Sequence, residues 1–187
     1  MKRQLLVCLA LPVAYVVTGG LGLMVTVPPG YATPVFLPAG LAITACFIAG
    51  LIALPGTFVG SFLLNMWIGY LIVGDFDLQT TVAALIVAGA SMMQAAVGGT
   101  TLRWTIGYPA PFCKVTDIPV FFMLAPILCL TSVSLSLYGL WEFGVIKSSE
   151  WNINWLMWWL GDTLGLLVSL PLLIWFGDEP LLSDRQP

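Results

Sequence analysis

The chain contains no histidine, and only 8% of its 187 residues are charged. It therefore lacks the most frequent general base and the usual ligand of haem and of transition metals. No GxxxxGK[ST] phosphate loop and no H-x-x-x-H or D-x-D-x-D-G pattern occurs in the sequence. A hydrolase would also need a base beside its nucleophile. We therefore expect a protein that is not an enzyme and that holds no metal and no cofactor.

Cysteine and positive charge are scarce as well. The four cysteines, at positions 8, 46, 113 and 129, have no C-x-x-C spacing, so the sequence predicts neither a disulfide framework nor a zinc site. The formal net charge is −3. Nucleic-acid binding depends on neutralising phosphates, so we expect no nucleic-acid partner.

Hydrophobic residues make up 59% of the chain, whereas charged residues fall far below the roughly 25% of soluble domains. A helical membrane span needs about 20 apolar residues. Proline and glycine clusters and short polar turns divide the apolar runs into six spans, at residues 5–27, 34–53, 56–74, 79–102, 118–140 and 153–176. Backbone amides in lipid must be satisfied within a helix. The sequence thus predicts an all-α, polytopic transmembrane bundle in which residues 1–187 form one integral membrane domain.

The basic residues predict the orientation, because lysine and arginine stay preferentially on the cytoplasmic side. With the N-terminus inside, only Lys147 lies outside, and the other basic residues are cytoplasmic: Lys2, Arg3, Arg103, Lys114 and Arg185. We therefore expect cytoplasmic N- and C-termini and a multi-pass protein of the cell inner membrane. The outer loops hold four acids and are mildly acidic: Asp75, Asp77, Glu142 and Glu150.

A carboxylate stands within the last span, in the stretch WLMWWLGDTLGLLVSLP. Asp162 lies about nine residues into this span, or roughly 14 Å of helical rise, which is near mid-membrane. Insertion of a carboxylate there costs about 2.5–3.5 kcal/mol, so we expect it to face the bundle interior or a wet cavity. A step of 100° per residue places six side chains on one stripe: Trp151, Trp155, Trp158, Asp162, Gly165 and Ser169.

Two roles for Asp162 follow from its position. In the first, it contacts a ligand or responds to protons in a pocket walled by tryptophans, since ionisable residues within a membrane are functional by default. In the second, it caps a helix broken at Gly161 or accepts structural hydrogen bonds. Trp155 and Trp158 are the tryptophan candidates for the pocket, although an interfacial aromatic belt also explains Trp155.

Three other spans place a polar group at comparable depth, namely Thr44, Asn65 and Gln94. No lysine or arginine lies clearly within a span, so any partner of Asp162 must be a neutral donor of this kind. These residues are pocket candidates. The alternative is interhelical hydrogen bonding, which is worth about 0.6 kcal/mol on average.

Small residues and prolines indicate how the spans pack. Gly56 and Gly60 have the GxxxG spacing that brings two helices close, either within the bundle or in a homodimer. The prolines within spans remove backbone donors and can kink helices: Pro38, Pro126 and Pro171. In FLPAG, residues 36–40, the predicted break is either a simple kink or a discontinuous helix that lines a cavity.

Three segments resemble a known family. FLPAGLAITACFIAGLIALPGTFVGSFLLN, QAAVGGTTLRWTIGYP and WLMWWLGDTLGLLVSLPLL are similar to successive motifs of the MASE-type integral membrane sensor domain. The resemblance covers about residues 1 to 180. The positions that match its motifs are Pro38, Gly40, Pro55, Gly60, Asn65, Gln94, Trp155, Gly161, Asp162, Gly165 and Pro171. Gly56 joins this set of structural positions through the GxxxG pattern.

The resemblance implies a sensory input module of bacterial signalling proteins, joined in the same chain to a cytoplasmic histidine kinase, diguanylate cyclase or phosphodiesterase. Such links imply two-component or cyclic-di-GMP signalling. Members usually have more spans than this chain, so the resemblance implies a truncated six-span portion. Residues 177–187 would then be a cytoplasmic junction to further spans or to the output module.

We expect the lipid bilayer and an unknown small molecule or membrane protein as partners. The alternative function is the substrate-binding membrane subunit of a vitamin-type transporter, which has a similar size and tryptophan content. A scaffold that anchors a partner and binds no ligand is a third option.

Overall fold

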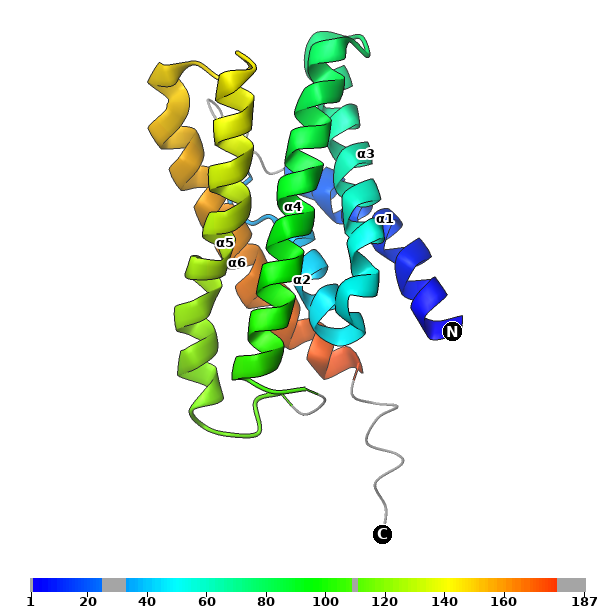
Figure 1. Cartoon of the computed structure of the whole chain (residues 1–187), viewed down its shortest axis with the longest axis vertical. Coiled ribbons are helices and arrows are strands. Elements are labelled where there is room, and N and C mark those ends of the chain that lie inside the picture. The colour runs from blue at the N-terminus through cyan, green and yellow to red at the C-terminus, as the bar shows by residue number, and fades with distance from the viewer. Residues whose placement is uncertain (1, 25–32, 109–110, 178–187) are drawn as a thin grey trace.

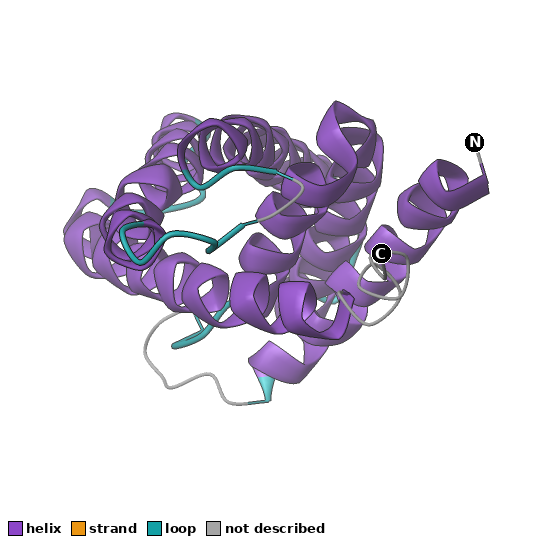
Figure 2. Cartoon of the chain, turned by 90° about the horizontal axis from the view of Figure 1, so that it is seen from below, coloured by secondary structure: helices purple, strands orange, loops and turns teal. Residues whose placement is uncertain are grey.

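The computed structural model describes residues 2–24, 33–108 and 111–177. All regular structure in these residues is helical, which confirms the predicted all-α class (Figure 2). The α-helices are α1 (Lys2–Leu23), α2 (Leu37–Ala49), α3 (Leu54–Val73), α4 (Leu78–Thr105), α5 (Asp117–Glu142) and α6 (Trp151–Gly177). Two short 3₁₀ helices, η1 (Gly50–Ala53) and η2 (Ser148–Glu150), precede α3 and α6.

The helices pack as a ring that α2 closes. Contacts run from α1 to α3, from α3 to α4, from α4 to α5 and from α5 to α6, while α2 packs against α6, α1 and α4. The connections from α3 to α4 and from α5 to α6 lie at the upper end in Figure 1, and the α4–α5 connection lies at the lower end. The start of α1 and the end of α6 also lie toward the lower end (Figure 1).

The basic side chains at or near the described connections are found at both of these ends. Arg103, in the last turn of α4, and Lys114, before α5, lie at the lower end, whereas Lys147 lies at the upper end. The predicted assignment of these ends to the two sides of a membrane stays a prediction. The predicted junction at 177–187 lies outside the described residues, apart from Gly177.

Four described segments are long and apolar enough to cross a membrane: Leu37–Val73, Leu78–Thr105, Asp117–Glu142 and Ser148–Trp175. The first of these contains α2, η1 and α3, and Leu9–Leu23 is a shorter apolar helix. The described residues therefore contain four candidate spanning segments, whereas the sequence predicted six spans. Part of this difference comes from the chain reversing within the first segment.

The direction of α2 follows from its contacts. Gly98 and Gly99 of α4 lie against Ile43 and Cys46 of α2, so α2 runs parallel to α4. By contrast, α3 runs antiparallel to α4, because Ser61 pairs with Ser91 whereas Gly69 lies against Thr80. Since α2 and α3 run in opposite directions, the chain turns at η1.

The predicted span over 34–53 is not confirmed as a membrane crossing, because α2 begins at Leu37, has only 13 residues and is followed by η1. Helix α2 rises about 20 Å, too little on its own to cross a hydrocarbon layer of about 30 Å. Pro38 stands in its first turn, where a missing N–H costs nothing, so Pro38 starts the helix rather than kinking it. The preceding backbone is anchored to α6, since the Phe36 N–H donates to the Gly161 carbonyl at 2.9 Å. The predicted break at residues 36–40 is therefore the start of a short helix, and neither a kink nor a helix that lines the cavity is seen there.

Glycines let α2 lie directly on α6. A Cβ on Gly40 would collide with the Gly165 carbonyl, and one on Gly165 would collide with the Phe36 carbonyl. Both glycines therefore mark a backbone-to-backbone crossing at which no side chain fits. The crossing lies halfway along α6, so α2 begins in the middle of the bundle.

Arg103 holds the other end of α2. Its Nε donates to the Phe47 carbonyl at 2.7 Å and its Nη2 donates to the Ile48 carbonyl at 3.2 Å. The guanidinium also lies 4.4 Å from the centroid of the Tyr108 ring. A cation at a helix C-terminus satisfies free carbonyls and complements the helix dipole. One side chain of α4 thus terminates the short helix.

The predicted GxxxG pair serves contacts within the chain. A Cβ on Gly60 would lie 2.7 Å from the Tyr15 Cβ, so α1 occupies this face of α3. Gly56 is also buried. Pro55 stands in the first turn of α3, while Pro126 and Pro171 lie inside α5 and α6, which continue through them.

Candidate functional site

A cavity of about 360 Å³ opens in the upper half of the bundle. Its walls come from the second half of α3, the first half of α4, the start of α6 and the adjacent connections, with Thr33 and Phe36 below them. No lining residue belongs to α2. Because α2 begins halfway along the bundle, it fills the lower half only. We call the part that contains α2 the filled half and the part with the cavity the open half.

The polar wall of the cavity is built by α3 and α4. Asn65 and Ser91 line the cavity, and Ser61 connects them behind the wall. The Asn65 Nδ2 donates to the Ser61 carbonyl at 2.8 Å, and the Ser61 hydroxyl donates to the Ser91 Oγ at 3.2 Å. From α1, the buried Tyr15 hydroxyl reaches the same Ser91 Oγ at 3.4 Å. Three helices therefore converge on one serine at the edge of the cavity.

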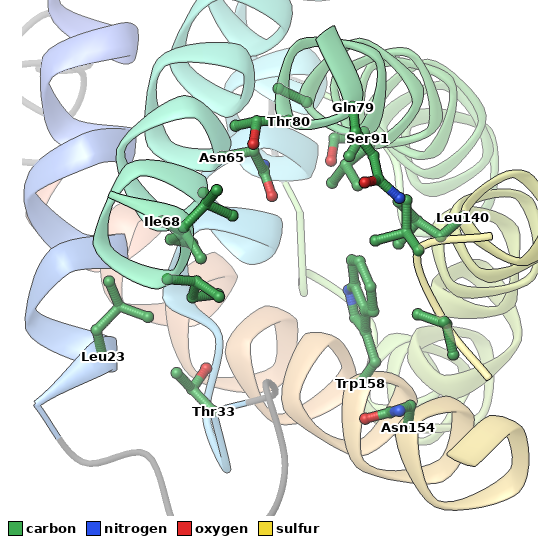
Figure 3. A pocket seen from close by; sticks show the side chains of 18 of the residues that line it. Leu23, Thr33, Asn65, Ile68, Gln79, Thr80, Ser91, Leu140, Asn154 and Trp158 are labelled. Atoms are coloured by element: carbon green, nitrogen blue, oxygen red, sulfur yellow. The ribbon is translucent and has the colours of Figure 1, made fainter. Parts of the chain in front are cut away.

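The facing wall comes from α6. Asn154 and Trp158 are one turn apart and both line the cavity. Figure 3 shows the Trp158 ring projecting from α6 into the space, with Asn65 on the opposite wall. The indole face is a large apolar surface that stacks on rings and attracts cations.

Asp77 is the charged residue among those that line the cavity, and it caps α4. Its Oδ1 accepts from the Thr80 N–H at 2.7 Å. Hydrogen bonds from the Thr80 hydroxyl and backbone N–H lower the pKa of Asp77 below its usual 3.8. Because Asp77 is exposed, its negative charge stands at the water-facing rim of the cavity.

Asp162 lies one helical turn beyond the cavity floor. It is 1% exposed, which confirms that this carboxylate faces the bundle interior. It follows Trp158 by one turn of α6, and Gln94, which lies beside it, follows Ser91 by about one turn of α4. The contact falls short of good hydrogen-bond geometry, since Asp162 Oδ1 and Gln94 Nε2 both lack a partner among the described residues. Cys129 and Thr163 lie beside Asp162 and Gln94 and complete a buried polar group.

The start of α2 lies against the turn of α6 that carries Asp162. Gly161, the residue before Asp162, accepts the Phe36 N–H. Asp162 therefore belongs to the boundary between the open and filled halves.

The predicted site residues fall into three groups. Asn65 and Trp158 line the cavity, and Asp162 and Gln94 lie together beneath it. Thr44 is buried in the filled half, where its hydroxyl donates to the Gly40 carbonyl at 2.7 Å. Trp155 does not line the cavity: its Nε1 contacts Ser134 of α5 at 3.4 Å, and its ring stacks on that of Trp159 at 5.8 Å.

The matched motif residues gather at two crossings. Pro38, Gly40, Gly161 and Gly165 lie where α2 meets α6, and Gly60 lies where α3 meets α1. These glycines and Pro38 shape the backbone around the cavity, whereas Asn65, another matched residue, presents its side chain to it.

Sequence reasoning missed four lining or supporting residues, namely Tyr15, Thr33, Ser91 and Asn154. Asn154 precedes Trp158 by four residues, so it shares its face of the helix. This spacing was an available signal, but the tryptophans around it are more conspicuous. Within the described residues, no group of three or more histidine, cysteine or acidic side chains could hold a metal ion.

Comparison of the chain with curated proteins and with solved structures gives no match. A family model does match, and it covers residues 5–180, which include all the helices that build the cavity and the two crossings. This range is nearly the whole chain. The chain therefore belongs to the MASE1 family of membrane-associated sensor domains.

Proposed function

We propose that the chain is the sensory input domain of a bacterial signalling protein in the inner membrane, and that the cavity of the open half receives its stimulus. The output would be a cytoplasmic histidine kinase, diguanylate cyclase or phosphodiesterase module of the same native chain. The observation that carries the proposal is a largely apolar cavity with a few polar groups in its walls, inside the helical bundle of a sensor-family member.

Helix α6 is suited to transmit a change in the cavity. It carries a cavity wall at Asn154 and Trp158, the buried Asp162, and the crossing with α2 at Gly165. A ligand that binds one helix arrangement better than another shifts the population toward that arrangement. Coupling of this kind is typically worth about 1–3 kcal/mol. Because α6 is continuous to the lower end, a tilt or shift at Trp158 is carried to Gly177.

The alternative, a substrate-binding subunit of a transporter, would also use such a cavity. Family membership favours the sensor, since the matching family is one of sensor domains. Copurification with an ATPase and a transmembrane coupling subunit would favour the transporter instead.

The test is a fusion of residues 1–187 to a diguanylate cyclase, with cyclic-di-GMP measured in cells. Trp158→Leu opens the cavity wall, and Trp155→Leu is the matched control on the side of the same helix that faces α5, outside the cavity. We expect Trp158→Leu and Asp162→Asn to change output at least threefold at equal membrane levels, with Trp155→Leu like wild type. If both cavity-side variants signal like wild type under every stimulus, the proposal is lost.

A further inference from the structure

The walls of the cavity restrict the chemistry of its ligand. We propose that the cavity binds an organic cation, a protonated amine or quaternary ammonium on an apolar body that contains a ring. The proposal rests on the sensory role of the cavity described above and adds the class of ligand.

The apolar part of the ligand follows from the lining. Most of the cavity surface belongs to apolar side chains, among them Ile68, Val87 and Leu140, with Trp158 on the facing side. A body that covers these side chains gains roughly 25 cal/mol for each Å² of apolar surface removed from water. A planar ring also finds the indole face of Trp158, against which rings stack.

The sign of the charge follows from the lining and from the rim. No lysine or arginine is among the lining residues, whereas the Asp77 carboxylate stands at the rim. The connections at this end add three acids and one base: Asp75, Glu142, Glu150 and Lys147. An anion would lose its hydration without gaining a positive partner, which is costly. A cation keeps an opposite charge within reach and can lie over the Trp158 ring.

Hydrogen-bond acceptors for the ammonium are also present. The Thr33 side chain lines the cavity, is only 5% exposed, and its Oγ1 has no hydrogen-bond partner among the described residues. Asn65 adds an amide on the wall across from Trp158. A protonated amine has N–H donors and no acceptor, which suits this hydroxyl oxygen and the amide oxygen, whereas a quaternary ammonium would rely on the Trp158 ring and the Asp77 charge.

The start of α2 is the feature that would favour an anion, since helix N-termini attract negative charge. That helix start does not reach the cavity with its donors. Pro38 has no N–H, the Ala39 N–H donates to the Phe36 carbonyl at 3.2 Å, and no residue of α2 lines the cavity. The acidic rim therefore favours a ligand with a positive charge.

The test uses three probes of similar size and different charge: 2-phenylethylamine, 2-phenylethanol and 3-phenylpropionate. Their Kd values are measured by calorimetry on the full chain in an uncharged detergent. We expect the amine to bind most tightly and the carboxylate most weakly. Asp77→Asn removes the charge but keeps a side chain that caps helices equally well. The Asp77→Asn variant should lower the ratio of the amine affinity to the alcohol affinity about two- to fivefold, as expected for the loss of a solvent-exposed ion pair.

Trp158→Leu should weaken amine binding at least threefold, and Trp155→Leu should leave it unchanged. Equal binding of the three probes, tightest binding of the carboxylate, no binding of the amine, or an amine preference that survives Asp77→Asn unchanged would each overturn the proposed ligand class. The sensory role is judged separately by the cyclic-di-GMP output of the fusion. If Trp158→Leu alters the cyclic-di-GMP output but the carboxylate probe binds most tightly, the proposal of a cationic ligand is rejected and the proposed sensory role is retained.

Discussion

The filled and open halves of the bundle are surrounded by the same helices and differ by one, α2. In the filled half, backbones touch: Gly40 lies on Gly165, and Gly99 lies on Cys46. In the open half, the corresponding space is a cavity with Asn65 and Trp158 in its walls. A binding site therefore arises here because one helix starts in the middle of the bundle, and the walls need no unusual residues.

The two halves also treat their polar groups differently. In the filled half, polar side chains bond to backbone carbonyls, as Thr44 does with Gly40 and Arg103 with Phe47. In the open half, hydroxyls of different helices meet one another at Ser91. Bonds to the backbone fix a structure, whereas hydroxyls can exchange partners by rotation. The hydroxyls that meet at Ser91 are thus polar groups that a ligand in the open half can rearrange.

The largest expected effect breaks the contact that separates the halves. Gly165→Val would place side-chain carbons against the Phe36 carbonyl, whose carbon would lie 2.6 Å from the new Cβ. We expect a loss of about 3 kcal/mol or more of unfolding free energy, because overpacking against backbone cannot relax. Thermal unfolding in detergent measures it. Gly89→Ala is the control, since nothing lies within 4 Å of an added Cβ there, and a loss of stability comparable to that of Gly165→Val would contradict the account.

The next effect concerns the lower end of α2. Arg103→Gln removes the charged donor to the Phe47 and Ile48 carbonyls and the contact with Tyr108. Hydrogen bonds to charged groups are worth about 1.5–3 kcal/mol, so we expect a loss in that range. Lys114→Gln removes an exposed basic residue at the same end and should change the unfolding midpoint little. Equal midpoints for the two variants would mean that Arg103 does not hold α2.

A third prediction compares packing density directly with one substitution in each half. Ala83 lines the cavity and is half-buried, whereas Ala95 is fully buried in the cluster that contains Tyr15, Ala42, Cys46 and Leu64. We expect Ala95→Val to cost about 1–3 kcal/mol through overpacking. Ala83→Val should cost less than about 0.5 kcal/mol because its methyl groups enter open space. A larger drop in the unfolding midpoint for Ala83→Val than for Ala95→Val, measured side by side, would contradict the comparison.

The smallest effect is the pH dependence of the α4 cap. Because the pKa of Asp77 is lowered in the folded chain, its capping contribution is complete above pH 3.8 and is lost as the pH falls through the lowered value. Asp77→Ala should therefore lower the unfolding midpoint at pH 7, with a difference that shrinks toward pH 3. Asp77→Asn caps without titrating, so its midpoint should stay near that of wild type at pH 7. A gap between Asp77→Ala and wild type that widens in acid would refute this.

The sequence predicted the all-α class and the sensor family, and the ends of all six predicted spans agree with those of the helices to within a few residues. Apolar composition carries the information for spans, but it does not say where a helix starts. Pro38 is compatible with a kink or with a first turn, and only the Phe36–Gly161 hydrogen bond decides between them. The same ambiguity limits how well the sequence predicts the number of helices that cross a membrane.

The candidate site was predicted less completely. Trp155 and Trp158 lie on one predicted stripe, yet Trp155 turns toward α5 and Trp158 into the cavity. A stripe spans a wide arc of the helix surface, so spacing alone could not separate them. Ser91 and Thr33 gave no signal, because a single neutral hydroxyl in an apolar run costs little and is common. The cavity itself depends on the length of α2 and so on tertiary contacts.

Thiol accessibility tests most directly whether the open half contains a cavity. In the chain with its four cysteines replaced by alanine, Ala83→Cys places a thiol at a half-buried position of the cavity wall. Ala88→Cys places one further along α4, at a fully buried position outside the lining. The account predicts that methyl methanethiosulfonate modifies Cys at 83 at least ten times faster than Cys at 88. Equal rates, or protection of both positions until the protein unfolds, would contradict it.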